Sequence, residues 1–188
     1  MKIEDRVYGD EEIKEKVLTD LINCKSIQRL KGLAQFGLPD EYYHRDGFSR
    51  YEHSLGVLVF LRRLDANLTE QIAGLLHDVS HTAFSHVIDW AIGNPEKEDF
   101  QDKNHYNLIR NSEIPQILEK YNLDYNEVSK IENFPLLEKP APILCADRVD
   151  YTLREIAFDG DINLSRKFLF NLQNRNGDLF FVGRDIAD

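Results

Sequence analysis

The sequence predicts an all-α fold with, at most, a short β-hairpin near the C-terminus. Along most of the chain, apolar residues recur at intervals of three and four, the spacing that places them on one face of an α-helix. Breaks rich in glycine and proline separate these segments, for example at residues 37–39 and 93–95. A short run with strand character, residues 179–182, follows the turn sequence Asn-Arg-Asn-Gly at 174–177.

Residues 11–36 are predicted to form the first helical segment. Apolar residues between positions 13 and 22 share one face, and a second set between 27 and 34 continues the pattern. Residues 24–26 are a candidate break between two helices. Residues 38–48 are predicted to form a loop.

Two capping signals predict where the next helices begin. Ser49 stands three residues before Glu52, the arrangement of a capping box, so a helix is expected to start there. Asn67 and Glu70 have the same spacing and predict the start of the helix that carries His77.

The rest of the chain continues in short helical segments. A surface loop is expected at 94–104 and a proline-rich turn region at 135–142. Helices are predicted through 88–92 and over 105–121, 124–131, 143–158 and 164–172.

Composition limits the classes of partner. The chain has 188 residues, of which 42% are hydrophobic and 30% charged. This length and composition predict one globular domain over residues 1–188. Its formal net charge of -10 disfavours binding to a nucleic-acid duplex or to an anionic membrane. A small anionic ligand stays possible, because a metal ion and a few arginines can reverse the local field.

Cysteine usage and the first residues indicate a cytoplasmic protein. Cys24 and Cys145 form no metal-binding pair and are expected to be reduced, buried thiols. The charged start, MKIEDRVYGD, has no signal-peptide core. No closing element follows residue 182, so we expect the natural protein to continue beyond Asp188.

A metal site is the strongest functional signal. His77 and Asp78 end the apolar run 72–76, where burying polar groups without a partner costs several kcal/mol. A divalent cation is one such partner, and His53 and Asp147, each on an apolar helical face, could complete its shell. Imidazole and carboxylate ligands suit Mn, Fe, Ni or Zn, and Mg fits two histidines less well.

The alternative is that these histidines are hydrogen-bonded core residues, which is the commoner role of a single histidine on an apolar face. The density of histidines favours the metal site, because four of the six fall between His53 and His86.

Four segments carry a family resemblance. They are IQRLKGLAQFG at 27–37, SRYEHSLGV at 49–57, LLHDVSHTAFSH at 75–86 and ADRVDYTLRE at 146–155. In order and spacing they resemble the HD-domain metal-dependent phosphohydrolases, and among these the deoxynucleoside-triphosphate triphosphohydrolases. The resemblance covers roughly residues 27–182 and implies the helical HD-domain fold.

The resemblance implies one divalent metal ion, bound by His53, His77, Asp78 and Asp147. It also implies that Arg50 contacts a phosphate, a role that suits the guanidinium fork. A solvated arginine at the start of a helix is the alternative.

Further roles follow from the same resemblance. The implied catalytic residues are His81, His86, Asp89 and His105. The implied substrate-binding residues are Gln35 and Tyr151 at the deoxyribose, Glu155 near the sugar and Arg148 at the phosphates. Two positions depart from the family pattern: Tyr106 stands where glutamate is common, and Glu155 stands where aspartate is usual.

The implied reaction is hydrolysis of a deoxynucleoside triphosphate to nucleoside and triphosphate. One alternative is an HD hydrolase of a nucleoside monophosphate, a cyclic nucleotide or an alarmone. Another is a noncatalytic domain that senses a nucleotide. A nucleotide is therefore the expected partner, and a homo-oligomer the expected assembly.

Overall fold

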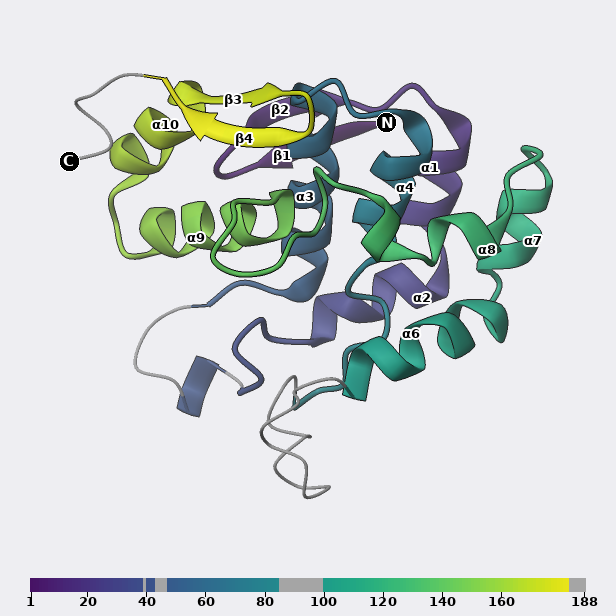
Figure 1. The fold of residues 1–188 in the computed structure, drawn as a ribbon. Coiled ribbons are helices and arrows are strands. Elements are labelled where there is room, and N and C mark those ends of the chain that lie inside the picture. Colours follow the sequence, from purple (N-terminus) through teal and green to yellow (C-terminus); the bar gives the residue numbers. More distant parts are fainter. Residues whose placement is uncertain (39, 43–46, 85–99, 183–188) are drawn as a thin grey trace.

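The structure, a computed structural model, describes residues 1–38, 40–42, 47–84 and 100–182 (Figure 1). The described chain is mainly helical, as predicted, and carries two antiparallel hairpins. The strands are β1 (Lys2–Asp5), β2 (Gly9–Glu12), β3 (Leu172–Arg175) and β4 (Asp178–Phe181). The helices are α1 (Lys16–Ile22), α2 (Lys25–Gln28), α3 (Arg50–Arg63), α4 (Leu68–Leu76), α6 (Phe100–Arg110), α7 (Ile114–Glu119), α8 (Tyr125–Val128), α9 (Ala146–Phe158) and α10 (Ile162–Asn171), with single 3-10 turns at Arg29–Gly32, Asp40–Tyr42 and Ile131–Asn133.

Both capping predictions are confirmed. Ser49 accepts a hydrogen bond from the backbone N–H of Glu52, and the Glu52 side chain accepts from the backbone N–H of Ser49. Asn67 caps α4 by accepting from the backbone N–H of Glu70. The predicted C-terminal hairpin is also confirmed, with Leu172 paired to Phe181 and Arg175 paired to Asp178.

The predicted helix at 11–36 is wrong at its start. The chain begins with the hairpin β1–β2, and α1 starts only at Lys16. Ile13 is fully buried, yet it lies in an extended segment whose backbone pairs with Met1 in both directions at 2.8 Å. An apolar side chain can fill the core from an extended chain as well as from a helix. For this reason the apolar spacing that begins at Ile13 wrongly predicted a helix there.

Three other boundaries differ from the prediction. Helix α6 begins at Phe100, inside the predicted loop 94–104. The predicted helix 105–121 is two helices, because α6 ends at Arg110 and α7 starts after a bend with Pro115 in its first turn. The helix expected from Ile143 starts at Ala146.

Helix α3 is the central element of the fold. It packs against α4 on one side and α9 on the other (Figure 1). Ten of its residues are buried, including Leu58, Phe60 and Leu61 in the apolar core. A glycine allows each close approach: a Cβ atom on Gly74 would strike Leu61, and one on Gly56 would strike side chains of α9. Helix α3 is therefore in close contact with both α4 and α9.

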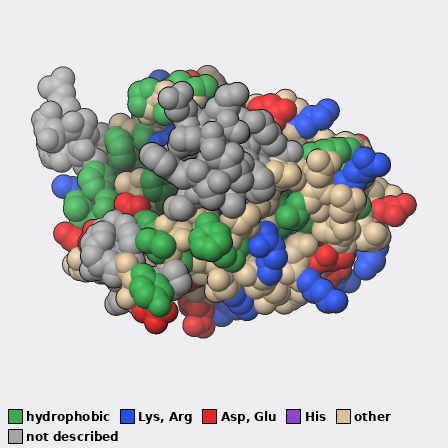
Figure 2. Space-filling model, turned by 90° about the horizontal axis from the view of Figure 1, so that it is seen from below, with side chains coloured by type: hydrophobic (Ala, Val, Ile, Leu, Met, Phe, Trp, Pro, Cys, Tyr) green, Lys and Arg blue, Asp and Glu red, His purple; other side chains and the backbone are tan. Residues whose placement is uncertain are grey.

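The described surface carries both charges. On the face shown in Figure 2, basic and acidic side chains are interspersed over the part that is not grey. Among the described helices, no segment is both long and apolar enough to cross a bilayer.

Candidate metal centre

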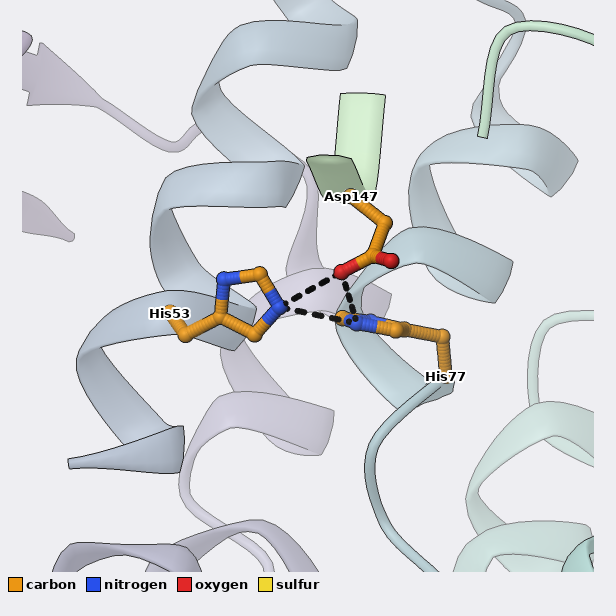
Figure 3. A group of neighbouring side chains, drawn as sticks. All are labelled: His53, His77 and Asp147. Atoms are coloured by element: carbon orange, nitrogen blue, oxygen red, sulfur yellow. Dashed lines mark hydrogen bonds and ion pairs between the residues drawn. The ribbon is translucent and has the colours of Figure 1, made fainter. Parts of the chain in front are cut away.

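Three side chains from three parts of the chain converge where α3, the end of α4 and the start of α9 meet (Figure 3). The Nε2 atom of His53 lies 2.9 Å from Oδ1 of Asp147 and 3.1 Å from Nε2 of His77. His77 Nε2 lies 3.5 Å from the same Asp147 oxygen. Ligand atoms about 2.1 Å from one tetrahedral or octahedral ion are about 3.0–3.4 Å apart. The three atoms therefore have the spacing of ligands around one cation.

Both rings are oriented by their other nitrogen. His53 Nδ1 lies 2.7 Å from Oδ2 of Asp150, and His77 Nδ1 lies 2.7 Å from the carbonyl oxygen of Gly74. Each Nδ1–H can donate to these acceptors, which leaves the Nε2 lone pairs facing each other and Asp147. A histidine held in this way is the usual arrangement of a metal ligand.

Electrostatics at the cluster favour a cation. Burial alone would lower the pKa of His53, but its hydrogen bonds to Asp147 and Asp150 outweigh burial and raise the pKa to about 10. Burial would raise the pKa of Asp147, whereas its hydrogen bonds to His53 and His77 hold that pKa below the ordinary value. The cluster thus attracts positive charge, which a proton or a metal ion can supply.

Asp78 lies beside this cluster and is the fourth predicted ligand. Its Oδ1 is 3.5 Å from His77 Nε2, and its Oδ2 is 3.8 Å from His53 Nε2. Asp78 also accepts a hydrogen bond from Arg50 at 2.6 Å and pairs with His81 Nε2 at 3.1 Å. Despite its burial, these positive neighbours hold its pKa well below the ordinary value.

Arg50 is not a solvated residue at the start of a helix. Its side chain is 3% exposed and reaches inward from the first turn of α3 to Asp78. Its other Nη atom donates to the backbone carbonyl of Gln35 at 3.1 Å. Arg50 therefore joins the segment around Gln35 to the metal-ligand candidates.

Two predicted catalytic histidines are buried near the centre. His81 is buried and pairs with Asp78. His105, on α6, is buried with its Nδ1 3.5 Å from Ser80 Oγ. Burial, reinforced by the nearby positive charge of His77, lowers the pKa of His105 to about 4, so its ring is neutral at neutral pH. His86 and Asp89 lie outside the described residues.

The predicted substrate-binding residues are spread around the centre. The Tyr151 ring, half-buried on α9, lies 6.5 Å from the His53 ring. Glu155 is one helical turn further along α9, also half-buried. Arg148 donates to Glu138 at 3.3 Å and to the Lys139 carbonyl at 3.1 Å. It would have to leave these partners to hold a phosphate.

A second group, Glu138, Cys145 and Asp147, also has metal-like spacing. Its chemistry fits a cation poorly. Burial raises the pKa of the Cys145 thiol to about 11, and Arg148 donates to both Cys145 Sγ and Glu138. A guanidinium in contact with two of three ligand candidates leaves the His53 group as the better metal centre.

Sequence reasoning missed the residues that support the ligands. Asp150 contacts His53, and Arg154 contacts Asp150 at 2.8 Å. The spacing of four between these two residues is the signal that could have indicated a pair on α9. Arg29, in the 3-10 turn Arg29–Gly32, donates to the carbonyl of His81 at 2.9 Å, a contact that no spacing reveals.

Comparison with known proteins shows the family of this chain. The HD domain family matches residues 50–150, which include His53, His77, Asp78 and Asp147. The chain is 46% identical to YdhJ of Bacillus subtilis (strain 168) over 183 residues, 96% of this chain and 56% of that protein. It is 39% identical to the metal-dependent phosphohydrolase cns2 of Cordyceps militaris over 160 residues, 85% of this chain and 46% of that protein.

Two further matches are more distant. A deoxynucleoside triphosphate triphosphohydrolase, SAMHD1 of Bos taurus, is 36% identical over 104 residues, 46% of this chain and 17% of that protein. A crystal structure of a phosphohydrolase from Bacteroides thetaiotaomicron has the same fold, with a TM-score of 0.67 and 23% identity over 96% of this chain and 48% of that one. The chain spans about half the length of the first two relatives. On these matches, the chain belongs to the HD domain family.

Proposed function

We propose that this chain holds the active site of a metal-dependent phosphohydrolase that acts on nucleotides. The observation that carries the proposal is the convergence of His53 Nε2, His77 Nε2 and Asp147 Oδ1 within 2.9–3.5 Å. Asp78 next to them offers the fourth ligand. Similarity to the phosphohydrolase cns2 supports the reaction class.

The donor set fits one divalent ion of Mn, Fe, Ni or Zn, with Mg less well suited to two imidazoles. The chemistry that such an ion supplies is polarisation of a phosphate oxygen and acidification of a water molecule. The protein supplies the orientation, through the fixed Nδ1 atoms of both histidines.

The charged residues around the ligands are suited to phosphate chemistry. Arg50 donates to Asp78 and to the Gln35 carbonyl, and it would exchange one of these partners to bind a phosphate oxygen at the edge of the centre. His81, held by Asp78 at 3.1 Å, can donate a proton to the leaving oxygen. His86 and Asp89 are proposed to assist this transfer. His105, neutral at neutral pH, is a further proton acceptor.

We propose a deoxynucleoside triphosphate as substrate. Support comes from the similarity to SAMHD1 of Bos taurus, which is 36% identical over 104 residues. Tyr151 lies near His53, where its ring could pack on a deoxyribose and exclude a 2′-hydroxyl. Gln35 and Glu155 are proposed to contact the sugar, and Arg148 the triphosphate. Water would attack the α-phosphorus, the bond to the 5′-oxygen would break, and that oxygen would take the proton.

The test is metal analysis of the purified protein followed by turnover on a panel of nucleotides, with products identified by mass. We expect about one metal ion per chain, and release of nucleoside and triphosphate from deoxynucleoside triphosphates. Release of pyrophosphate or inorganic phosphate, or turnover of monophosphates, cyclic nucleotides or alarmones alone, would contradict this substrate. A rise in melting temperature with nucleotide and no turnover would indicate a sensor. Size determination with and without nucleotide tests the expected homo-oligomer.

A further inference from the structure

We infer that the N-terminal hairpin β1–β2 is part of the metal centre. Asp5, at the end of β1, is a positioning residue that acts through Arg154 and Asp150 to hold the His53 ring. The inference rests on the proposed metal binding by His53. Asp5 lies 48 positions before His53 in the sequence, and nothing in its sequence context indicates this role.

A continuous series of buried contacts joins the two residues. Asp5 Oδ2 accepts a hydrogen bond from Arg154 Nη2 at 2.6 Å. Arg154 Nε donates to Asp150 Oδ2 at 2.8 Å, and the same Asp150 oxygen lies 2.7 Å from His53 Nδ1. The side chains of all four residues are at most 5% exposed. Each contact is therefore sheltered from solvent that could replace it.

The hairpin holds Asp5 rigidly. The other carboxylate oxygen of Asp5 accepts hydrogen bonds from the backbone N–H groups of Val7, at 2.8 Å, and Tyr8, at 2.9 Å. These bonds hold the turn at residues 6–8 against Asp5. Gly9, with a φ of +76°, ends the turn. A carboxylate that accepts two bonds from its own turn has little freedom to move, so it fixes the position of Arg154.

Arg154 transmits this position because its guanidinium is planar. It bridges Asp5 and Asp150 through different nitrogens, which a lysine cannot do. The Tyr8 and Phe48 rings lie on it, each centroid 5.9 Å from Cζ. Gly56 leaves the room it needs, since a Cβ there would strike Arg154 and Asp150.

Asp150 connects this support to the ligand. Its Oδ2 contacts both Arg154 and His53, whereas its buried Oδ1 has no hydrogen-bond partner among the described residues. The hydrogen bond from Arg154 therefore helps to fix the orientation of the carboxylate. Because Asp150 accepts from His53 Nδ1, this orientation determines how well His53 Nε2 is aimed at the metal.

The experiment compares Mn²⁺ binding by the purified protein and by matched charge-neutralised variants. Free Mn²⁺ is measured by electron paramagnetic resonance during titration. We expect Asp5→Asn to weaken binding by about tenfold, the lower end of the range for residues that orient metal ligands. The control is Asp10→Asn on the same hairpin, which loses the same charge from an exposed side chain paired with Lys2 and should bind as wild type. His53→Ala should lose binding by more than 100-fold.

Two further measurements separate a positioning role of Asp5 from an effect on the stability of the whole protein. The Co²⁺ absorption spectrum of Asp5→Asn should change shape at saturating Co²⁺, and Asp5→Glu should restore part of the wild-type spectrum. In an Asp150→Asn background, Asp5→Asn should add no further loss of Mn²⁺ affinity, because the connection is already broken.

The outcomes are distinct. Equal Mn²⁺ affinity of Asp5→Asn and Asp10→Asn, with loss in His53→Ala, overturns the role of Asp5 alone. Wild-type affinity in His53→Ala overturns the proposed metal centre. If Asp5→Asn does not fold, Arg154→Lys decides, since it keeps the charge but cannot bridge both carboxylates; wild-type affinity there overturns the inference.

Discussion

The Nε2 atoms of His53 and His77 lie 3.1 Å apart, although the two residues are 24 positions apart in the sequence. Because each Nδ1–H donates to its own acceptor, the two facing Nε2 lone pairs need a proton or a cation between or beside them. The Asp147 carboxylate lies within 3.5 Å of both, and each ring is fixed by a bond at Nδ1. This pair is the basis of the metal centre and of the first prediction.

Replacing His77 with alanine should remove the metal. We expect the metal content of His77→Ala to fall from about one ion per chain to less than a tenth, because the variant loses one of the two imidazole donors and keeps only one nitrogen ligand for a metal that favours nitrogen. Elemental analysis after gel filtration measures this. Asp10→Asn, on the exposed side of the hairpin, serves as the control and should keep its metal. Full metal content in His77→Ala would contradict the assignment.

Gly56→Ala should destabilise the protein. In an ordinary helix interior this change stabilises by about 1 kcal/mol. Here the added Cβ would strike Asp150 and Arg154, so we expect a loss of about 1–3 kcal/mol in the free energy of unfolding. Urea titration of circular dichroism measures it.

Gly32→Ala is the matched control for this prediction, because nothing lies within 4 Å of a Cβ at that position. It should change stability little. A stabilised Gly56→Ala protein would show that α3 and α9 are not in close contact.

His105 should make stability depend on pH. Burial lowers its pKa to about 4, below the value of about 6.5 expected in the unfolded chain. The unfolded state therefore binds the proton more readily, and stability falls as pH drops from about 6.5 to about 4. His105→Gln should lose this pH-dependent part of the free energy of unfolding, which amounts to at most about 3 kcal/mol.

The difference in unfolding free energy between wild type and His105→Gln isolates this component from the other groups that titrate. This difference should be constant above pH 7. Between pH 6.5 and 4 the wild type should lose stability steadily relative to His105→Gln. A difference that does not vary with pH would mean that His105 is not buried in its neutral form.

Both cysteines should be unreactive in the folded protein. Burial raises the pKa of Cys24 and of Cys145 to about 11, so little thiolate exists at pH 8. We expect 5,5′-dithiobis(2-nitrobenzoic acid) to label less than a fifth of a thiol per chain within minutes, and both thiols in guanidinium chloride. Fast labelling of the native protein would show that one cysteine is accessible.

Tyr151 should control the choice of sugar if the substrate is a deoxynucleoside triphosphate. Tyr151→Ala should raise the relative rate with ribonucleotides by about tenfold or more, since space for a 2′-hydroxyl opens. Tyr151→Phe keeps the ring and should keep the selectivity. Ratios of kcat/KM for paired deoxy and ribo substrates measure the effect, and an unchanged ratio in Tyr151→Ala would place the sugar elsewhere.

Local signals in the sequence predicted much of the helical structure. The capping box at Ser49 and the cap at Asn67 each predicted the start of a helix, because a cap needs only residues three apart. The hairpin at the N-terminus was not predicted, because Ile3 and Val7 fill the core from a short strand and its turn, whereas Ile13, in extended chain, happens to continue the helical spacing of the residues after it. Helix boundaries near prolines were also misplaced.

By itself, the sequence determined the family, the helical class and the ligand candidates His53, His77, Asp78 and Asp147, because these depend on residue types and short spacings. Only the tertiary structure decided that Asp78 is paired with Arg50, that Asp150 orients His53, and that Asp5 supports Asp150 through Arg154. Such contacts join residues from distant elements. They exist because α3, α9 and the hairpin β1–β2 pack around one buried point. The spacing of residues along the sequence does not indicate that packing.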